Sequence, residues 1–118
     1  MPDRLAPYVE AWRRRRVEEQ EADRRRREEA WDEARKAARL LVDEFGVRRV
    51  VAFGSLASGR FRRGSDVDLA VEGLPPERFF RADARLAWEL SVPIDLKLLA
   101  DCPPLLRKRI EEEGVELA

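Results

Sequence analysis

The sequence contains no histidine, asparagine or threonine, and its only cysteine is Cys102. A single cysteine cannot form an intramolecular disulfide, and without histidine the usual zinc sites cannot be assembled. The missing histidine also excludes Ser-His-Asp and Cys-His catalysis. A catalytic metal ion would therefore need oxygen ligands, which favours a hard cation such as magnesium or manganese.

Long apolar runs are absent as well. No stretch approaches the roughly 20 residues of a membrane span, and residues 1–4 contain no apolar signal core. We therefore expect a cytoplasmic protein with no membrane partner. The 24 lysines and arginines balance the 24 aspartates and glutamates, so a general affinity for nucleic acid is not indicated.

The chain of 118 residues is the size of one ordinary domain, and 44% of its residues are apolar. Residues 3 to about 45 are predicted to form one long helix, or two in series, because no glycine or proline interrupts residues 8–45. We assign residues 1–45 to a charged helical extension and residues 46–118 to a folded domain.

The predicted N-terminal helix allows three interpretations. Its arginine quartets at 13–16 and 24–27 suggest nucleic-acid binding, but the interleaved acidic residues favour a solvated helix with internal ion pairs. The third interpretation rests on Leu5, Val9 and Trp12, which share one helix face far from the other apolar residues. These side chains could dock on a partner chain or on a second copy of the protein.

Residues 46–118 alternate between strand and helix patterns. Glycine and proline residues separate the segments, and period-2 alternation marks the strands. Strands are predicted at 47–53, 66–71, 92–99 and 115–117, with a short helical turn at 56–59 and helices at about 75–90 and 103–113. The apolar faces of the two later helices are expected to comprise Phe79, Phe80, Leu86, Ala87 and Leu90, and then Leu105, Leu106 and Ile110.

Three aspartates are the main candidates for chemistry. Asp66 and Asp68 are two residues apart in a predicted strand, so their carboxylates should share a face. Asp95 lies in another predicted strand and would join them if the two strands are neighbours. Alone, such a pair is also typical of solvent-facing strand residues. Three converging carboxylates would suit a two-metal phosphoryl-transfer site.

A glycine and a serine follow the first predicted strand directly. Gly54 would let the backbone approach a phosphate closely, and Ser55 would offer a hydroxyl at the start of a helical turn. Taken alone, the dipeptide is more often an ordinary turn. The segment is not a Walker loop, because no Gly-Lys-Ser/Thr follows and the glycines are wrongly spaced.

Together these features resemble the minimal nucleotidyltransferases of the DNA polymerase beta superfamily. Gly54-Ser55, ten intervening residues, Asp66-x-Asp68 and the later Asp95 match the family signature, and the similarity spans residues 45–117. Many relatives carry arginine directly after Gly-Ser and before the next glycine, where this chain has Leu56 and Ser58. The cations facing a triphosphate would then be expected among Arg60, Arg62, Arg63 and Lys97.

The resemblance implies an α/β (α+β) fold with a small mixed sheet backed by helices and a site on the open face. It implies that Gly54, Ser55 and Ser65 contact the nucleotide and that Asp66 and Asp68 bind two Mg²⁺ ions, with Mn²⁺ as a substitute. Asp95 would bind the catalytic ion and help to activate the acceptor hydroxyl. The hydroxyl would attack the α phosphate of ATP or another nucleoside triphosphate in line and release pyrophosphate.

Relatives of this kind are often antitoxins paired with a HEPN-type ribonuclease toxin, and several are thought to adenylylate a tyrosine of that partner. The resemblance therefore implies a protein adenylyltransferase acting on such a toxin. The alternative is a non-catalytic antitoxin or scaffold that neutralises its partner by binding. Transfer to RNA or to a small aminoglycoside-like acceptor is disfavoured, because no second substrate domain is evident in the sequence.

Overall fold

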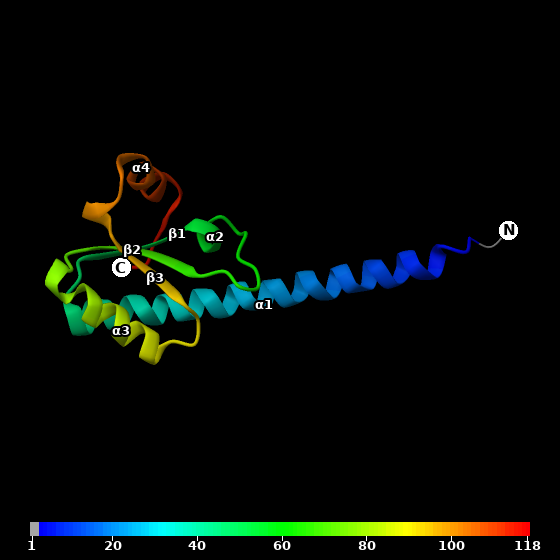
Figure 1. Cartoon of the computed structure of the whole chain (residues 1–118), viewed down its shortest axis with the longest axis horizontal. Coiled ribbons are helices and arrows are strands. Elements are labelled where there is room, and N and C mark those ends of the chain that lie inside the picture. The colour runs from blue at the N-terminus through cyan, green and yellow to red at the C-terminus, as the bar shows by residue number, and fades with distance from the viewer. Residues whose placement is uncertain (1–2) are drawn as a thin grey trace.

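A computed structural model of the protein describes residues 3–118 (Figure 1). Residues 1 and 2, part of the expected N-terminal extension, lie outside the described residues. A small α/β domain forms the body of the molecule, and the first part of a long helix projects from it. The elements are α1 (Ala6–Phe45), β1 (Arg49–Phe53), α2 (Gly54–Ala57), β2 (Val67–Glu72), a 3₁₀ turn (Pro76–Arg78), α3 (Phe79–Glu89), β3 (Ile94–Leu98), a second 3₁₀ turn (Leu99–Asp101), α4 (Pro104–Glu113) and β4 (Val115–Glu116).

The four strands form one mixed sheet in the order β3-β2-β1-β4. Strand β1 runs antiparallel to β2 and β4, whereas β2 and β3 are parallel. Parallel neighbours need a crossover connection, and α3 lies in the segment that provides it. The sheet and its helices confirm the predicted fold class, and β4 confirms the predicted edge strand.

Helices α1 and α3 cover one face of the sheet, and α4 covers part of the other (Figure 1). Alternating side chains of the strands explain the two layers. On the first face, Leu69 and neighbouring strand residues pack against Leu41 of α1 and Leu86 of α3. On the second face, Val51, Phe53 and Ala70 pack with Ile110 of α4.

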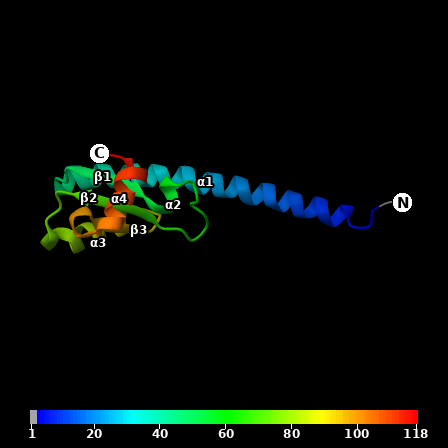
Figure 2. The same cartoon turned by 90° about the horizontal axis from the view of Figure 1, so that it is seen from above.

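Helix α1 is continuous over 40 residues and ends at Gly46, whose φ of 67° suits a glycine C-cap. Its buried residues begin only at Ala30. The preceding turns project beyond the domain, so the molecule measures 70 × 31 × 19 Å (Figure 2). Among the described residues, no helix has both the length and the apolar character needed to cross a membrane.

Two predicted helix faces were partly wrong. In α3 the buried side chains are Ala82 and Leu86, whereas Phe80 is 81% exposed and Ala87 is also exposed. In α4 Ile110 is buried but Leu105 is exposed. Each helix packs against the rest of the domain along one side only. Its buried face is therefore narrow, and the neighbouring apolar side chains remain exposed to solvent.

Candidate active site

The chain bends at Gly54, where β1 ends and α2 begins. Gly54 has a φ of 71°, a conformation that favours glycine. Phe53 pairs with Asp68 across β1 and β2, which brings the Asp68 side chain against the bend. A β-carbon on Gly54 would lie 2.2 Å from Oδ2 of Asp68. Glycine is therefore required here for both its backbone conformation and the space that it leaves.

Asp68 and Asp95 are direct register partners on the parallel strands β2 and β3. Their side chains therefore lie on the same sheet face, as predicted for neighbouring strands. Partial burial raises the pKa of Asp68 to about 6, and the negative charge of Asp95 and hydrogen bonding with its carboxyl group add to this rise. Two close carboxyl groups repel each other when both are ionised, so the pair is a favourable site for a cation.

Asp66 departs from the predicted strand. It lies one residue before β2 and is exposed, because a turn precedes it. In this turn the backbone N–H of Ser65 donates to the Arg62 carbonyl at 2.9 Å, and the Ser65 hydroxyl accepts from the Arg62 N–H at 3.0 Å. Asp66 makes the smallest contribution among the causes that raise the pKa of Asp68.

The carboxylate oxygens of Asp68 and Asp95 suit a hard divalent cation, but Asp66 does not lie with them as a third ligand. Asp68 and Asp95 form a close pair, but nowhere in residues 3–118 do three acidic, histidine or cysteine side chains converge as metal ligands. A cation on the pair would relieve the like-charge repulsion, and its charge would attract the carboxylate of Asp66 from the adjacent turn. The residues therefore fit magnesium or manganese.

Lys97 lies on the Asp95 side of the carboxylate pair. Its Nζ is 3.4 Å from Oδ2 of Asp95, and its positive charge lowers the pKa of Asp68. Lys97 therefore offsets part of the negative charge of the site. The structure places it beside a carboxylate and not beside the Gly54-Ser55 bend.

The bend itself borders a pocket of about 440 Å³. Gly54, Ser55 and Arg60 line it from one side, and Arg109 of α4 lines it from another. The Ser55 hydroxyl donates no hydrogen bond to any residue of the described chain. The complete lining is Phe53, Gly54, Ser55, Ala57, Ser58, Arg60, Leu106, Arg109, Ile110 and Glu113.

The other two predicted loop arginines lie elsewhere. Arg62 borders a groove along α1 that includes Trp12 and Arg16. Arg62 and Arg63 also border a separate pocket beside Pro93. Of the predicted loop cations, Arg60 alone therefore shares the pocket at the bend. Arg109 was not predicted, since it lies more than 50 residues away in the sequence and only the packing of α4 brings it to the bend.

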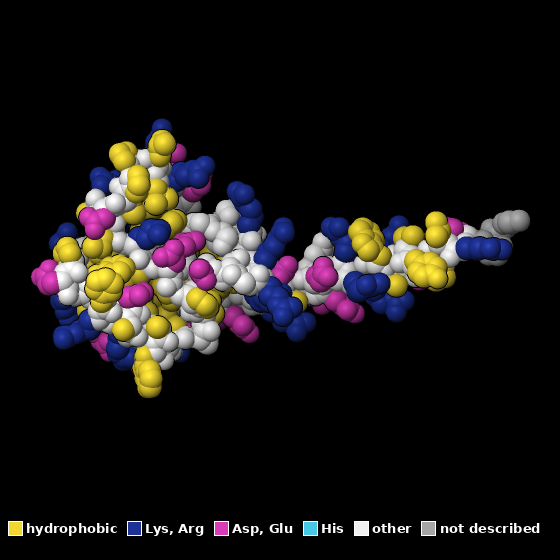
Figure 3. All heavy atoms as spheres, in the orientation of Figure 1, with side chains coloured by type: hydrophobic (Ala, Val, Ile, Leu, Met, Phe, Trp, Pro, Cys, Tyr) yellow, Lys and Arg dark blue, Asp and Glu magenta, His cyan; other side chains and the backbone are white. Residues whose placement is uncertain are grey.

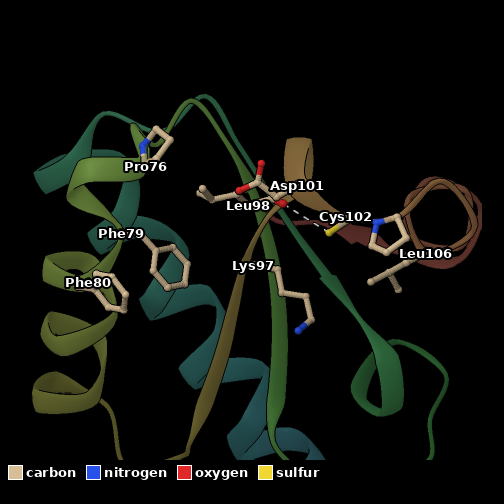
Figure 4. Close-up of a pocket in the computed structure, with 9 residues that line it drawn as sticks. Pro76, Phe79, Phe80, Lys97, Leu98, Asp101, Cys102 and Leu106 are labelled. Atoms are coloured by element: carbon tan, nitrogen blue, oxygen red, sulfur yellow. Dashed lines mark hydrogen bonds between the residues drawn. The ribbon is translucent and has the colours of Figure 1, made fainter.

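Another pocket, of about 450 Å³ and largely apolar, lies beside Lys97 and shares Leu106 with the pocket at the bend. Figure 4 shows Phe79 and Phe80 of α3 on one side and Cys102 and Leu106 on the opposite side, with Lys97 between them. Lys97 therefore connects this pocket to Asp95. Pro76, Leu98, Asp101 and Pro103 complete the lining.

Comparisons with known proteins identify relatives of this arrangement. The profile of the family described as "Nucleotidyltransferase domain" matches residues 34–117. A solved chain described as a minimal nucleotidyltransferase is 32% identical, with a TM-score of 0.54, and the match covers 80% of this chain and 92% of that one. No curated protein matches.

Two toxin–antitoxin structures also resemble the domain. A chain from a mutant MntA–HepT complex is 26% identical, with a TM-score of 0.59, over 70% of this chain and 69% of that one. A chain from a toxin–antitoxin structure with AMP-PNP is 24% identical, with a TM-score of 0.60, over 71% and 72%. The latter similarity demonstrates a shared fold.

Proposed function

Since this chain belongs to the minimal nucleotidyltransferases of the nucleotidyltransferase domain family, we propose that it transfers AMP from ATP to an acceptor hydroxyl. The observation that carries this proposal is the pairing of Asp68 with Asp95 beside the Gly54 bend. A carboxylate pair next to a bend that leaves room for phosphate is the arrangement that phosphoryl transfer requires.

Each residue has a proposed role in this reaction. Asp66, Asp68 and Asp95 would hold two magnesium ions, and Mn²⁺ could replace them. When bound, these ions would neutralise the triphosphate and make the acceptor hydroxyl more acidic. The phosphates would lie in the pocket that Gly54 and Ser55 line, and Ser55 can donate its hydroxyl to them.

The two pockets adjoin different carboxylates, and on this basis we propose which reactant each one holds. In-line displacement requires the attacking and leaving oxygens to lie on opposite sides of the α phosphate. The pocket at Gly54 adjoins Asp68 and would receive the leaving pyrophosphate. The apolar pocket adjoins Asp95 through Lys97, so the acceptor would approach over β3.

We further propose that the acceptor is a protein, a HEPN-type toxin that this chain neutralises as an antitoxin. Structural relatives from toxin–antitoxin complexes support this assignment. The apolar pocket supports it too, because the exposed Phe80 and the neighbouring Phe79 and Leu106 offer a surface for an apolar side chain of a protein.

Transfer can be tested with ATP labelled on the α phosphate, Mg²⁺ and a purified HEPN-type ribonuclease. The label should become attached to the ribonuclease and should disappear with Asp68→Asn or Asp95→Asn. Asp43→Asn, an exposed aspartate of α1 outside both pockets and the carboxylate pair, is the matched control. Labelling that survives both site substitutions, or that never occurs with any acceptor, would disprove the proposal.

The second candidate function is neutralisation by binding alone. Leu5, Tyr8, Val9 and Trp12 are exposed near the start of α1, and Figure 3 shows this apolar group separated from the domain by a charged stretch. Such a surface suits a partner chain or a second copy of this protein. Removing residues 1–28 tests this role: binding accounts for neutralisation if neutralisation is lost while transfer to a surrogate acceptor persists.

A further inference from the structure

Two arginines from distant parts of the sequence border the Gly54-Ser55 bend. Arg60 follows α2, and Arg109 lies in the middle of α4. Both line the pocket of about 440 Å³ that Gly54 and Ser55 also line. The pocket therefore has a cation on the loop and another on the helix that packs across the sheet.

Arg109 differs from its neighbours on α4 in the contacts of its side chain. In residues 3–118, neither Arg60 nor Arg109 forms an ion pair or a side-chain hydrogen bond. In contrast, Arg107 donates to the Ala100 carbonyl at 2.8 Å, and Lys108 lies 4.0 Å from Glu112. Glu113 is placed one helical turn after Arg109 but does not pair with it.

The two positions at the bend where many relatives carry arginine supply no positive charge in this chain. Leu56 is 1% exposed and belongs to the main core, so its position points away from the pocket. The Ser58 hydroxyl donates to the Ser55 carbonyl at 3.2 Å. Neither residue can supply positive charge, and a triphosphate bound at the bend would need charge from elsewhere.

Helix α4 is held firmly enough to present Arg109. Ile110, the next residue, is 1% exposed and packs against the sheet. Glu111 forms two hydrogen bonds with Arg49 of β1, at 2.7 and 2.9 Å. A side chain on a fixed element loses less entropy on binding a ligand than one on a free loop.

We infer that Arg109, together with Arg60, binds the β and γ phosphates of the nucleoside triphosphate. This inference rests on the proposed nucleotidyltransferase function and identifies the cations that recognise its substrate. The planar guanidinium groups can each form two hydrogen bonds with phosphate oxygens. AMP lacks these phosphates, so the two arginines should contribute little to its binding.

Calorimetric titrations of α,β-methylene-ATP, inorganic tripolyphosphate and AMP, each with Mg²⁺, test this inference. Arg109→Gln should weaken binding of the first two ligands about 10-fold or more and leave AMP binding unchanged. Arg60→Gln should act in the same direction. Lys108→Gln removes one charge from the same helix and should bind all three ligands as the wild type does.

Arg109→Lys retains the charge without the planar group and should give intermediate affinity, which separates recognition from a folding defect. Thermal melting of each variant checks the fold directly. Wild-type affinity for tripolyphosphate in Arg109→Gln would overturn the inference and leave the proposed function standing. If the wild type binds neither triphosphate ligand, both the inference and the proposed function fail.

Discussion

The carboxylate of Asp68 occupies the space in which a side chain on Gly54 would lie. Register explains this contact, because Asp68 pairs with Phe53, the last residue before the bend. The same register places Asp95 directly beside Asp68 on β3. One backbone bend and two strand pairings thus bring two carboxyl groups next to the pocket that Gly54 and Ser55 line.

Gly54→Ala should therefore abolish transfer, with a loss of at least about 100-fold in kcat. The added methyl group would displace the Asp68 carboxylate and disturb the position of any bound cation. Gly59→Ala is the matched control, because Gly59 also has a positive φ, 77°, but a β-carbon added there would meet nothing within 4 Å beyond its chain neighbours.

Both glycine variants should lose about 1 kcal/mol of stability through backbone strain. A Mn²⁺ titration followed by electron paramagnetic resonance should detect weakened binding in Gly54→Ala alone. Equal Mn²⁺ affinity in the two variants would contradict the proposed role of the contact between Gly54 and Asp68.

The raised pKa of Asp68 predicts a specific pH dependence in metal-free protein. Its pKa is 3.8 in the unfolded chain and about 6 in the folded one, so between these values the folded state retains a proton that the unfolded state has released. Stability should therefore fall as pH rises through this window. The side chain is partly solvated, so we expect a loss of about 1–2 kcal/mol.

Asp68→Asn removes this ionisation and should abolish that component of the pH dependence. Urea unfolding in EDTA between pH 4 and pH 7 measures the effect, and Asp43→Asn on the exposed side of α1 serves as the control. Added Mg²⁺ should stabilise the wild type above pH 6 and not the variant. Parallel pH profiles for wild type and Asp68→Asn would contradict the assignment.

The parts of the site that depend on the spacing of nearby residues could be predicted from the sequence. Alternation between apolar and charged residues predicted the strands that carry Asp68 and Asp95, and the glycine after the first strand predicted the bend. Asp66 was placed in the strand because its spacing continues the alternation, but the turn closed by Ser65 shifts the start of β2 by one residue.

Residues that depend on packing between distant elements could not be predicted in this way. Arg109 reaches the bend only because α4 packs across β1, and Phe80 is exposed because α3 buries only a narrow stripe. Arg62 and Arg63 appeared equivalent to Arg60 in the sequence, yet the turn at Ser65 directs them toward other surfaces. Local patterns do not contain such tertiary information.

Lys97→Met should change the ionisation of the site without removing a carboxylate. The positive charge of Lys97 lowers the pKa of Asp68, so its removal should raise that pKa further. The acidic limb of the transfer rate should then move to higher pH. Lys97→Arg retains the charge and should preserve the wild-type profile, whereas an identical shift in both variants would contradict this explanation.

Arg49 should contribute to stability through a network that joins four elements. Its guanidinium group contacts Glu72 of β2, Glu111 of α4 and Glu116 of β4, and these carboxylates raise its pKa. Arg49→Met should cost roughly 1 kcal/mol in total, because exposed ion pairs contribute little individually. Denaturant unfolding at low and high salt measures it, and a loss that salt does not reduce would argue against an electrostatic origin.

The two halves of α1 should respond differently to side-chain truncation. Leu41 is fully buried between the sheet and α3, so Leu41→Ala should reduce stability by about 2–5 kcal/mol. Trp12 is 55% exposed and lies against Arg16 of its own helix, so Trp12→Ala should cost less than about 0.5 kcal/mol. Trp12→Ala should nevertheless weaken association with a partner chain or a second copy, as measured by light scattering and pull-down. A large loss of stability in Trp12→Ala would show that the Trp12 side chain packs within its own chain and is not available to bind a partner.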